Sequence, residues 1–465
     1  MQKSFNGANI HIVGMARSGM AAAEVLSALG AALTLHDAKE ASALTDAIDL
    51  AERLGAKICC GSAAYQGIEG ADAVIRSPGV PLGSPGLAKA SALGIEIIPE
   101  IELAYRISPA PIIAITGTNG KTTTTALTGE MVRRSGRNTF IAGNIVAGNI
   151  RLPLVKAAFN ASPNDCIVAE ISSFQLESIT SFRPKVAMLL NISGDHMDRY
   201  SNIEEYALAK ARIFECQTDD DFGLINADNP AAMRCASAVR SRLLTFSRSH
   251  KVCRGTFARG TEIWWADEDG ERFICDTKNM KLRGAHNLEN ALAAAAAAVA
   301  VGVEPSAVQS AVDSFNPPEH RLEPVAEIGG VEFINNSMCT NVDASVASLA
   351  AIQRPAVVIA GGKDKGSDYT ELGRAFALHA KHVVLIGVDA PVIEHAARAA
   401  GFNRISHAQS LEDAVRQAWV LAEPGDTVIL SPGCASFDMF QDFEHRGRVF
   451  KSAVAELKAG VEEKG

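Results

Sequence analysis

The feature that most constrains the fold is an alternation of short apolar segments with helix-like segments along nearly the whole chain. Near its start, "NIHIVG", "ALTLHD", "ADAVIRSPGV" and "IEIIPE" have the pattern of strands, and "SGMAAAEVLSALG" has the pattern of a helix. Strands that alternate with helices form parallel sheets that are covered by helices. The sequence therefore predicts an α/β fold.

Two proline-bearing segments divide the chain into three predicted α/β domains in series. A chain of 465 residues exceeds the usual size of one domain, which is about 100–200 residues. The prolines of "ISPAPII" and "SFNPPEHRLEPV" stand between groups of strand patterns. We therefore expect domains at residues 1–98, 99–318 and 319–465. A polar, strand-like pattern from 217 to 282 predicts a hairpin within the second of them.

Composition excludes several classes of protein. The net charge of −9 makes the chain a poor non-specific binder of nucleic acid. The nine cysteines include no CxxC pair, so neither a zinc site nor a disulfide framework is expected. The longest apolar run, "ALAAAAAAVAVGV", is shorter than the ~20 residues that cross a bilayer, and we expect a buried helix there. With no signal-peptide pattern at the start, we expect a cytoplasmic, monomeric protein without membrane contact.

A phosphate-binding loop is predicted by "PIIAITGTNGKTTTT", which has the order strand, glycine-bracketed turn, lysine, hydroxyls. The full Walker pattern needs a further glycine, and Ile115 occupies its position. Glycines let backbone N–H groups approach phosphate, Lys121 reaches the terminal phosphates, and Thr122 offers a hydroxyl to Mg²⁺. The alternative is a glycine-rich turn with an exposed lysine.

Other strand ends carry candidate metal ligands. Glu170 ends the strand "CIVAE", where it can bind Mg²⁺ or pair with a lysine. In "LLNISGDHMDRY", His196 is flanked by Asp195 and Asp198, which favours a ligand over a structural histidine. By itself, Lys210 in "EEYALAKARIFE" has the pattern of a surface lysine.

Two further motifs are candidates for binding a nucleotide. In "GAHNLENALAAA", Asn287 and Asn290 lie on one face of a helix start and either read a purine edge or cap the helix. "GMARSG" resembles a dinucleotide fingerprint with Ala16 at the middle glycine, and Asp37 ends the next strand. This second motif supports a NAD-dependent dehydrogenase as an alternative function. In the last predicted domain, Arg321, Lys363 and Lys365 are cations near strand ends.

Taken together, "TGTNGKTT", "AEISSFQLES", "NISGDHMDRY", "GAHNLENA", "PEHRLE" and "SPGCASFDMFQDFEHRG", in this order, resemble the Mur ligases across nearly the whole chain. The resemblance implies a Rossmann-like N-terminal domain, a central P-loop ATPase-type parallel-sheet domain and a Rossmann-like C-terminal domain. "GDHMDRY" and "SFDMFQDFEHRG" are most similar to the members that add D-glutamate to UDP-N-acetylmuramoyl-L-alanine. In such members ATP phosphorylates the substrate carboxylate, and the amine of glutamate attacks the resulting acyl phosphate.

The resemblance also implies roles for individual residues in the ATP and metal sites. Lys121, His196 and Lys210 are implied as catalytic residues, with Lys210 carbamylated. Two Mg²⁺ ions are implied, with ligands at Thr122, Glu170, His196 and Lys210. The residues implied to bind ATP are Gly117, Thr118, Asn119, Gly120, Lys121, Thr122, Thr123, Asn287, Asn290 and Arg321.

The two other substrates have implied sites as well. The residues implied to bind the UDP substrate are Gly14, Ala16, Arg17, Ser18, Asp37, Ser77, Asn144, Ser172 and Gln175. The residues implied to bind glutamate are Thr340, Lys365, Ser436 and Phe443.

The chain departs from the family pattern in three places. The usual "NDSK" stretch is here Asn335 to Met338, so that an acid and a lysine are missing. We hypothesise that Lys363 replaces the missing lysine. "AGNIVAGNIRLP" is longer than the family's "GNIGLP", and the segment between Tyr200 and Tyr206 is short. A sister ligase that adds L-glutamate or another amino acid is the nearest alternative, and a non-catalytic binding module is a third.

Overall fold

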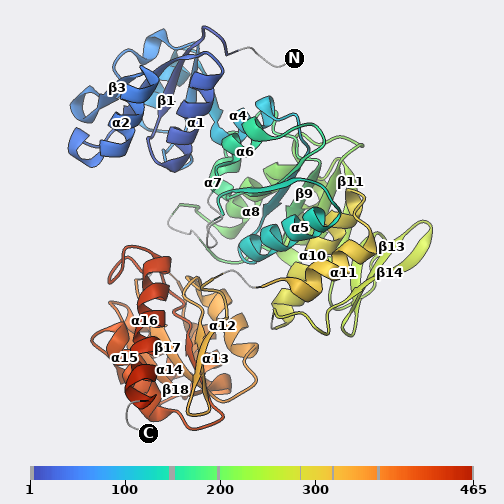
Figure 1. Ribbon diagram of the computed structural model, residues 1–465, viewed down its shortest axis with the longest axis vertical. Coiled ribbons are helices and arrows are strands. Elements are labelled where there is room, and N and C mark those ends of the chain that lie inside the picture. The colour runs from blue at the N-terminus through green and yellow to red at the C-terminus, as the bar shows by residue number, and fades with distance from the viewer. Residues whose placement is uncertain are drawn as a thin grey trace.

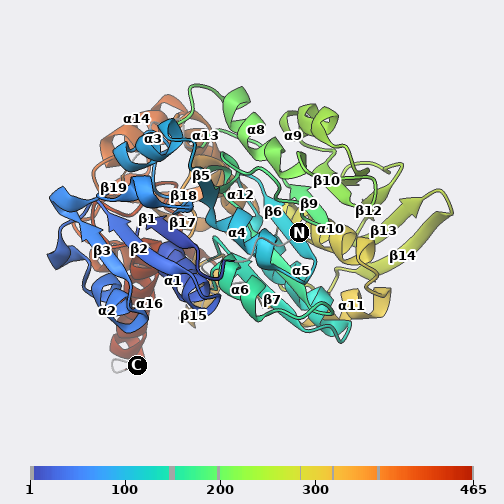
Figure 2. The same cartoon turned by 90° about the horizontal axis from the view of Figure 1, so that it is seen from above.

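The chain forms three α/β sheets in series (Figure 1), as the alternating pattern predicts. This computed structural model describes residues 5–145, 152–195, 199–282, 284–316, 319–363 and 367–462. The first and third sheets lie on the same side of the central one, which extends away from them (Figure 2). No helix in these described ranges combines the length and apolarity needed to cross a membrane.

The first sheet is parallel throughout, with the strand order β3-β2-β1-β4-β5. Its strands are β1 (Asn9–Val13), β2 (Ala32–Asp37), β3 (Lys57–Cys60), β4 (Ala73–Arg76) and β5 (Glu96–Pro99). Its helices are α1 (Arg17–Ala28), α2 (Thr45–Leu54) and α3 (Pro85–Ala92). The next helix, α4 (Glu100–Ile107), packs mainly against the central domain, where Glu100 accepts a hydrogen bond from N of Val155. The loops after β1 and β4 meet where the strand order reverses, which is the usual ligand position in such sheets.

The central sheet places the phosphate-loop strand β6 (Ile112–Thr116) between two parallel neighbours, β8 (Cys166–Glu170) and β9 (Val186–Leu189). The remaining strands are β7 (Thr139–Gly143), β10 (Phe222–Asn226), β11 (Arg242–Ser247), β12 (Gly255–Arg259), β13 (Glu262–Asp267) and β14 (Gly270–Asp276). Only β12, β13 and β14 form the antiparallel hairpins expected between 217 and 282, because β10 and β11 are parallel strands of the same sheet.

Seven helices in the described residues accompany the central sheet: α5 (Lys121–Arg134), α6 (Leu154–Asn160), α7 (Ser173–Leu176), α8 (Ile203–Ala211), α9 (Pro230–Met233), α10 (Ala285–Ala300) and α11 (Pro305–Ser314). The alanine-rich run forms α10, which is buried along most of its length and packs against α5. Small side chains allow this close approach of two helices, and the expected buried helix is confirmed.

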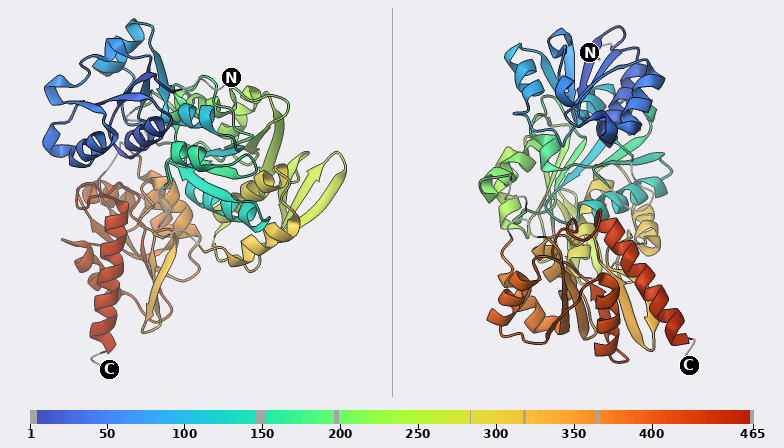
Figure 3. Two further views of the ribbon diagram at one scale, coloured as in Figure 1. Left: turned by 45° about the horizontal axis from the view of Figure 1, so that its top comes forward. Right: turned by 90° about the vertical axis from the view of Figure 1, so that its left-hand side faces the viewer.

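The third sheet has the order β15-β16-β20-β17-β18-β19, with only β15 antiparallel to its neighbour. Its strands are β15 (Glu323–Ile328), β16 (Val331–Asn335), β17 (Ala356–Gly361), β18 (Ala380–Ile386), β19 (Ile405–His407) and β20 (Thr427–Leu430). Its helices are α12 (Val342–Ala350), α13 (Thr370–His379), α14 (Ala390–Ala399), α15 (Leu411–Leu421) and α16 (Phe443–Glu462). The long C-terminal helix α16 lies along one side of this sheet (Figure 3).

We propose that the domains meet near residues 98 and 318, as the prolines predict. The first sheet ends with Pro99, and the third begins with Glu323. Each sheet also has apolar strands that are buried on both faces, as expected for parallel sheets between helices.

Candidate active site

The phosphate loop lies between the end of β6 and the start of α5. Gly117 and Gly120 have φ angles of +153° and +84°, which favour glycine. A Cβ atom at Gly120 would lie 2.3 Å from Oδ1 of Asn290, and one at Gly117 would lie 3.0 Å from Cβ of Leu190. Both glycines are therefore required by conformation and by the close approach of neighbouring elements.

Asn191, at the end of the strand segment next to β6, holds this loop in position. Its Oδ1 accepts a hydrogen bond from N of Asn119 at 2.8 Å, and its Nδ2 donates to O of Asn119 at 3.1 Å. The backbone O of Asn191 also accepts from N of Thr118 at 3.0 Å. These bonds hold the loop in one shape, which lowers the ordering cost of binding a phosphate.

Lys121 folds back over the loop. Its Nζ donates to O of Gly117 at 2.9 Å and to O of Thr118 at 2.8 Å. The next residue, Thr122, donates from Oγ1 to Oε2 of Glu170 at 2.8 Å. The lysine, the hydroxyl and the carboxylate thus lie around the first turn of α5, where backbone N–H groups favour an anion.

Glu170 and Lys210 are both buried beside the loop. Glu170 is 4% exposed and Lys210 is 2% exposed, so the interpretation of Lys210 as a surface lysine is wrong. Nζ of Lys210 donates to O of Gly117 at 2.9 Å. Burial and the charge of Lys121 lower the pKa of Lys210 well below its ordinary value, although Asp195 and Glu170 oppose them. Burial raises the pKa of Glu170, and the charge of Lys121 is the strongest opposing influence.

A cleft of about 420 Å³ opens from the phosphate loop toward the third sheet. Among the residues predicted as sites, the ones that line it are Thr118, Asn119, Gly120, Lys121, Thr122, Asn144, Glu170, Asn290, Arg321, Thr340 and Phe443. These residues come from the groups predicted to bind ATP, metal, the UDP substrate and glutamate. The structure therefore brings the central and third sheets together around one space.

Other predicted residues of the ATP group lie behind the cleft. Thr123 is fully buried and its Oγ1 has no hydrogen-bond partner among the described residues, so its side chain is not presented to a ligand there. Asn287 is buried, and its Oδ1 accepts from Nδ2 of Asn290 at 2.9 Å. The side chain of Asn290 in turn accepts from Oγ1 of Thr124 at 3.2 Å. His196 and Lys365 lie outside the described residues.

The residues predicted at the UDP end gather at the switch point of the first sheet, apart from the cleft. Oγ of Ser77 donates to O of Gly14 at 2.6 Å, which joins the loops after β4 and β1. Asp37 accepts from N of Met15 at 2.8 Å. Ala16, Arg17 and Ser18 follow at the start of α1.

Ser172, Gln175 and Asn144 belong to the central domain. Ser172 and Gln175 form a capping box at the start of α7, in which N of Ser172 donates to Oε1 of Gln175 at 2.8 Å. Asn144 follows β7 and donates from its backbone N to O of Glu170 at 2.8 Å, while its exposed side chain lines the cleft. The carboxyl ends of β7 and β8 therefore meet beside the phosphate loop.

The third sheet contributes the opposite wall through the loop after β16. Nη2 of Arg321 lies 3.3 Å from Sδ of Met338, and both residues line the cleft. Lys363 is exposed, pairs through its backbone with Ala435, and is absent from the described residues that line the cleft. The structure thus favours Arg321 over Lys363 as the cation next to Met338.

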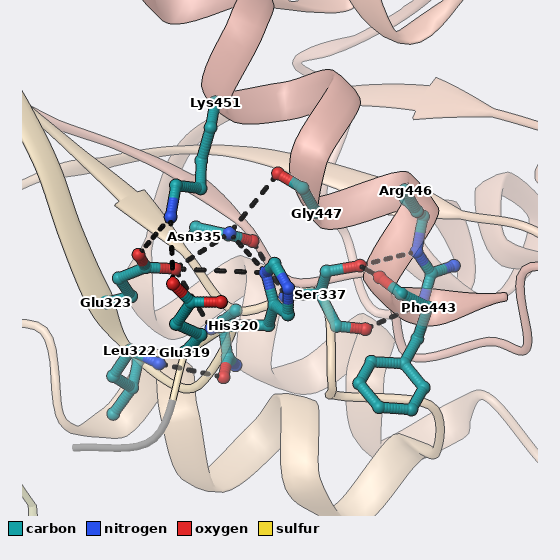
Figure 4. Close-up of polar contacts among 11 residues, drawn as sticks. Glu319, His320, Leu322, Glu323, Asn335, Ser337, Phe443, Arg446, Gly447 and Lys451 are labelled. Atoms are coloured by element: carbon teal, nitrogen blue, oxygen red, sulfur yellow. Dashed lines mark hydrogen bonds and ion pairs between the residues drawn. The ribbon is translucent and has the colours of Figure 1, made fainter. Parts of the chain in front are cut away.

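Ser436 and Phe443 lie on the two segments that follow β20. Ser436 is buried, and its backbone O accepts from N of Phe440 at 2.9 Å. Phe443 begins α16, and its backbone O accepts from Oγ of Ser337 at 2.7 Å (Figure 4). Phe443 lines the cleft, and Ser436 lies behind it.

Several cleft residues were not predicted from the sequence. They include Asn191, Asn226, Phe246, Glu289, Asn336 and Asn341. Asn191 and Asn226 stand at strand ends, the same signal that identified Glu170. The sequence signal at Asn341 was only that of a helix cap. In the structure its Nδ2 donates to Oδ1 of Asn119 at 3.2 Å, a hydrogen bond between the third and central domains.

The phosphate loop offers oxygen donors of the kind that Mg²⁺ takes. Within the described ranges no three His, Cys, Asp or Glu side chains gather in a metal-binding arrangement. Thr122 and Glu170 nevertheless place a hydroxyl and a carboxylate next to each other at the phosphate loop. Magnesium is often bound by one or two such oxygens together with substrate phosphates and water, so this pair fits the ion.

The fold and the cleft define an α/β protein of the phosphate-loop class, in which the nucleotide loop faces a separate C-terminal sheet. The sequence profile of the Mur ligase middle domain matches residues 115–298. The profile of the Mur ligase glutamate ligase domain matches residues 320–434, and that of the Mur ligase MurD-like N-terminal domain matches residues 8–99. The chain belongs to the Mur ligase family.

Similar proteins cover the chain almost completely. A UDP-N-acetylmuramoylalanine–D-glutamate ligase from Koribacter versatilis is 44% identical over 97% of this chain and 98% of its own length. One of the same name from Pelotomaculum thermopropionicum is 43% identical over 99% of this chain and 100% of its own.

Solved structures share the fold at lower identity. The pseudomurein peptide ligase type C of Methanothermus fervidus has a TM-score of 0.61 at 18% identity, covering 97% of this chain and 100% of that one. The UDP-N-acetylmuramate-alanine ligase of Thermotoga maritima has a TM-score of 0.60 at 18% identity, with the same coverage. The predicted three-sheet α/β architecture agrees with these structures.

Proposed function

We propose that the chain is an ATP-dependent ligase that joins D-glutamate to UDP-N-acetylmuramoyl-L-alanine in peptidoglycan synthesis. The observation that carries the proposal is the single cleft lined by both the phosphate loop and the third sheet. The names and full-length similarity of the relatives support the choice of substrates over those of a sister ligase. Family membership also favours a ligase over the dehydrogenase suggested by "GMARSG".

ATP is proposed to bind with its phosphates at the start of α5. The backbone N–H groups from Gly117 to Gly120 and the ammonium of Lys121 would neutralise the phosphate charge. Lys121 already lies over the loop, bonded to O of Gly117 and O of Thr118. Asn290 and Arg321, at the rim of the same cleft, are proposed to contact the nucleotide.

Magnesium is proposed at Thr122 and Glu170, with a second ion that would use His196 and the carbamylated Lys210. When bound, the metal would neutralise phosphate charge and orient the γ-phosphate. The chain's own contribution is the hydrogen bond that aligns Oγ1 of Thr122 with Oε2 of Glu170.

The UDP end of the second substrate is proposed to bind at the switch point of the first sheet. Gly14, Ala16, Arg17, Ser18, Asp37 and Ser77 would line that pocket, and Asn144, Ser172 and Gln175 would hold the muramoyl part. The capping box at α7 and the bond between Ser77 and Gly14 support preformed loops at these positions.

The chemistry requires two anions to meet. The substrate carboxylate attacks the γ-phosphorus of ATP, the bond to the β–γ bridging oxygen breaks, and an acyl phosphate and ADP form. The glutamate amine then attacks the acyl carbon, loses a proton, and phosphate leaves from a tetrahedral intermediate. Lys121 and Arg321 are the cations among the described residues that line the cleft, and they would stabilise the charge that develops. Thr340, Lys365, Ser436 and Phe443 are proposed to hold glutamate.

Lys210 is proposed to react with carbon dioxide. Its burial favours the neutral amine, whose lone pair can attack the carbon of CO₂ with loss of one proton. The carbamate formed is an anion with two oxygen atoms, which suits a hard metal ion. The buried position next to O of Gly117 directs these oxygens toward the phosphate loop.

The test is an assay of ADP release with purified protein. We expect release to require both UDP-N-acetylmuramoyl-L-alanine and D-glutamate, and to be much slower with L-glutamate. A dehydrogenase or a binding module would release none. Turnover with another amino acid in place of glutamate would identify a sister ligase. Sedimentation of the same preparation tests the proposed monomer.

A further inference from the structure

Arg446 is a fully buried arginine in the first turns of α16, and backbone carbonyls are its main partners. Its Nη2 donates to O of Ser337 at 2.9 Å and to O of Cys434 at 3.2 Å. Its Nη1 donates to O of Cys434 at 3.1 Å and to O of Ala435 at 3.5 Å. Its Nε donates to Oγ of Ser337 at 3.0 Å. All three nitrogens of the planar guanidinium therefore donate hydrogen bonds within the protein.

These contacts join three segments, and Figure 4 shows the one between Ser337 and Arg446, which are far apart in the sequence. Ser337 belongs to the loop after β16, Cys434 and Ala435 belong to the loop after β20, and Arg446 belongs to α16. Oγ of Ser337 also donates to O of Phe443 at 2.7 Å, which ties the start of α16 to the same point. Arg446 thus connects both loops to the helix through its hydrogen bonds.

The three segments carry the described residues that are proposed to hold glutamate. Thr340 lies in the loop after β16, Ser436 follows Ala435 directly, and Phe443 lies one turn before Arg446 on α16. A displacement of any one segment would separate these three positions. The position of the incoming amino acid therefore depends on the contacts of Arg446.

The charge of Arg446 has no partner of opposite sign in direct contact. Within the described residues, no ion pair joins this guanidinium to a carboxylate, and its hydrogen bonds end on four neutral oxygens. Burial lowers its pKa to about 10, so the group stays protonated at neutral pH. A buried cation without a contacting carboxylate favours the approach of an anion such as glutamate.

We propose that Arg446 is a positioning residue for the incoming amino acid, which fixes the loops after β16 and β20 against α16 and adds positive potential to the glutamate site. The inference rests on the proposed function, because it names the substrate whose binding should respond. It predicts that the affinity for glutamate falls selectively, because most of the residues proposed to bind ATP and the UDP substrate belong to the other two sheets.

Lysine cannot replace this arginine fully, which provides a graded test. Lys carries the same charge but has only three donors on a point-like ammonium, whereas the guanidinium has five donors in a planar fork. Arg446→Lys separates the charge from the geometry, and Arg446→Met removes both. Arg448, exposed on the same helix, offers the matched control Arg448→Met.

The experiment measures KM for each of the three substrates and kcat in the full-length protein and its variants. For Arg446→Met we expect KM for D-glutamate to rise at least tenfold, with KM for ATP and for the UDP substrate changed by less than twofold. The KM of Arg446→Lys for D-glutamate should lie between those of Arg446→Met and wild type, and Arg448→Met should have the wild-type value. Equal changes in all three KM values, or an unchanged KM for glutamate, would overturn the proposal.

A second measurement covers variants that fold poorly or lose all turnover. Ser337→Ala removes only the hydroxyl between Nε of Arg446 and O of Phe443, and we expect a smaller rise of the same KM. Hydrogen exchange should be faster in residues 336–341 and 431–440 of the Arg446 variants, with the central sheet unchanged. Unchanged exchange there would contradict the positioning role. If wild type shows no glutamate-dependent release of ADP, the proposed function fails instead, independently of the variants.

Discussion

Asn341 donates from Nδ2 to Oδ1 of Asn119 at 3.2 Å, and this bond joins the third sheet to the phosphate loop. The same side chain accepts at Oδ1 from N of Ala344 at 2.9 Å and so caps α12. On the other side of the loop, Asn191 holds the backbone of Asn119. A series of three asparagines therefore connects a strand end of the central sheet to the first turn of α12.

The contact predicts that Asn341→Asp impairs ligation without loss of stability. Aspartate keeps the capping oxygen but replaces the Nδ2 donor with an acceptor, which faces Oδ1 of Asn119. We expect kcat/KM for ATP to fall about tenfold, consistent with one lost hydrogen bond and one repulsive contact of ~1.4 kcal/mol together. The thermal midpoint should stay within a few degrees of wild type.

The control for this variant is Asn202→Asp, since Asn202 caps α8 in the same way by accepting from N of Glu205 at 2.8 Å. It should retain wild-type kinetics. Unchanged kcat/KM in Asn341→Asp would show that the bond between the domains does not contribute to turnover.

Lys121→Ala should leave the fold intact and abolish ligation. The ammonium donates to O of Gly117 and O of Thr118 in two partly buried bonds, and it lines the cleft, where water can take its place. The transition state, in contrast, loses its nearest positive charge, which we expect to cost at least ~10²-fold in kcat. Steady-state release of ADP measures this, with circular dichroism to compare the folds. Turnover near that of wild type would exclude the proposed ATP site.

Lys210→Ala should be nearly inactive and should regain activity with a small added carboxylic acid. Removal of the buried side chain leaves space beside O of Gly117, and a formate or acetate ion in it can supply the oxygen atoms of the proposed carbamate. The assay is ADP release as a function of added acid. Full activity without acid would contradict a role for Lys210 in the reaction.

Arg321→Ala should reduce turnover strongly, whereas Lys363→Ala should not. Arg321 lines the cleft 3.3 Å from the sulfur of Met338, and Lys363 is exposed outside that lining. We expect a loss of ~10²-fold or more for the first variant, as for removal of one charge-stabilising donor, and less than twofold for the second. A large loss in Lys363→Ala, rescued by Met338→Lys in the double variant, would restore the hypothesis that Lys363 replaces a missing lysine.

The stability of the first sheet should fall as the pH falls from about 6.5 to about 4. Nδ1 of His36 accepts from N of Tyr65 at 3.2 Å, so Nε2 carries the proton and donates to Nδ1 of His11 at 2.9 Å. Protonation of His36 at Nδ1 would place this new N–H donor opposite the N–H donor of Tyr65. Burial, followed by the charge of His11, lowers the pKa of His36 from 6.5 to about 4, and burial also lowers the pKa of His11.

Proton linkage gives the direction of this pH dependence. Below pH 6.5 the unfolded state binds more protons than the native pair of histidines, so stability falls as the pH falls. A pKa difference of this size corresponds to up to about 3 kcal/mol, which is present above pH 6.5 and lost progressively toward pH 4. Hydrogen exchange of β1 and β2 in the full chain, corrected for intrinsic rates, measures the free energy of opening. His36→Gln should flatten this dependence, and an equally steep one in the variant would refute the assignment to the pair.

The sequence by itself determined many of the strands, the phosphate loop and the order of the three sheets. Buried parallel strands produce short continuous apolar runs, and a loop that needs positive φ angles requires glycine, so both leave a local signal. Gly117, Gly120 and Glu170 were found in this way, because each stands at the end of such a run. The short strand β3 was missed, since its four residues are at most partly buried and form too short an apolar run to stand out from the surrounding sequence.

Only the tertiary structure decided which side chains meet. Thr122 and Thr123 are neighbours of the same type, yet a helix turns by about 100° per residue, so one contacts Glu170 and the other faces the core. Lys210 has the local pattern of a surface lysine, and its burial follows from packing against the phosphate loop. Arg446 and Ser337 are distant in sequence and meet because α16 packs across two strand ends. Such contacts depend on how whole elements pack, and local residue patterns do not encode that geometry.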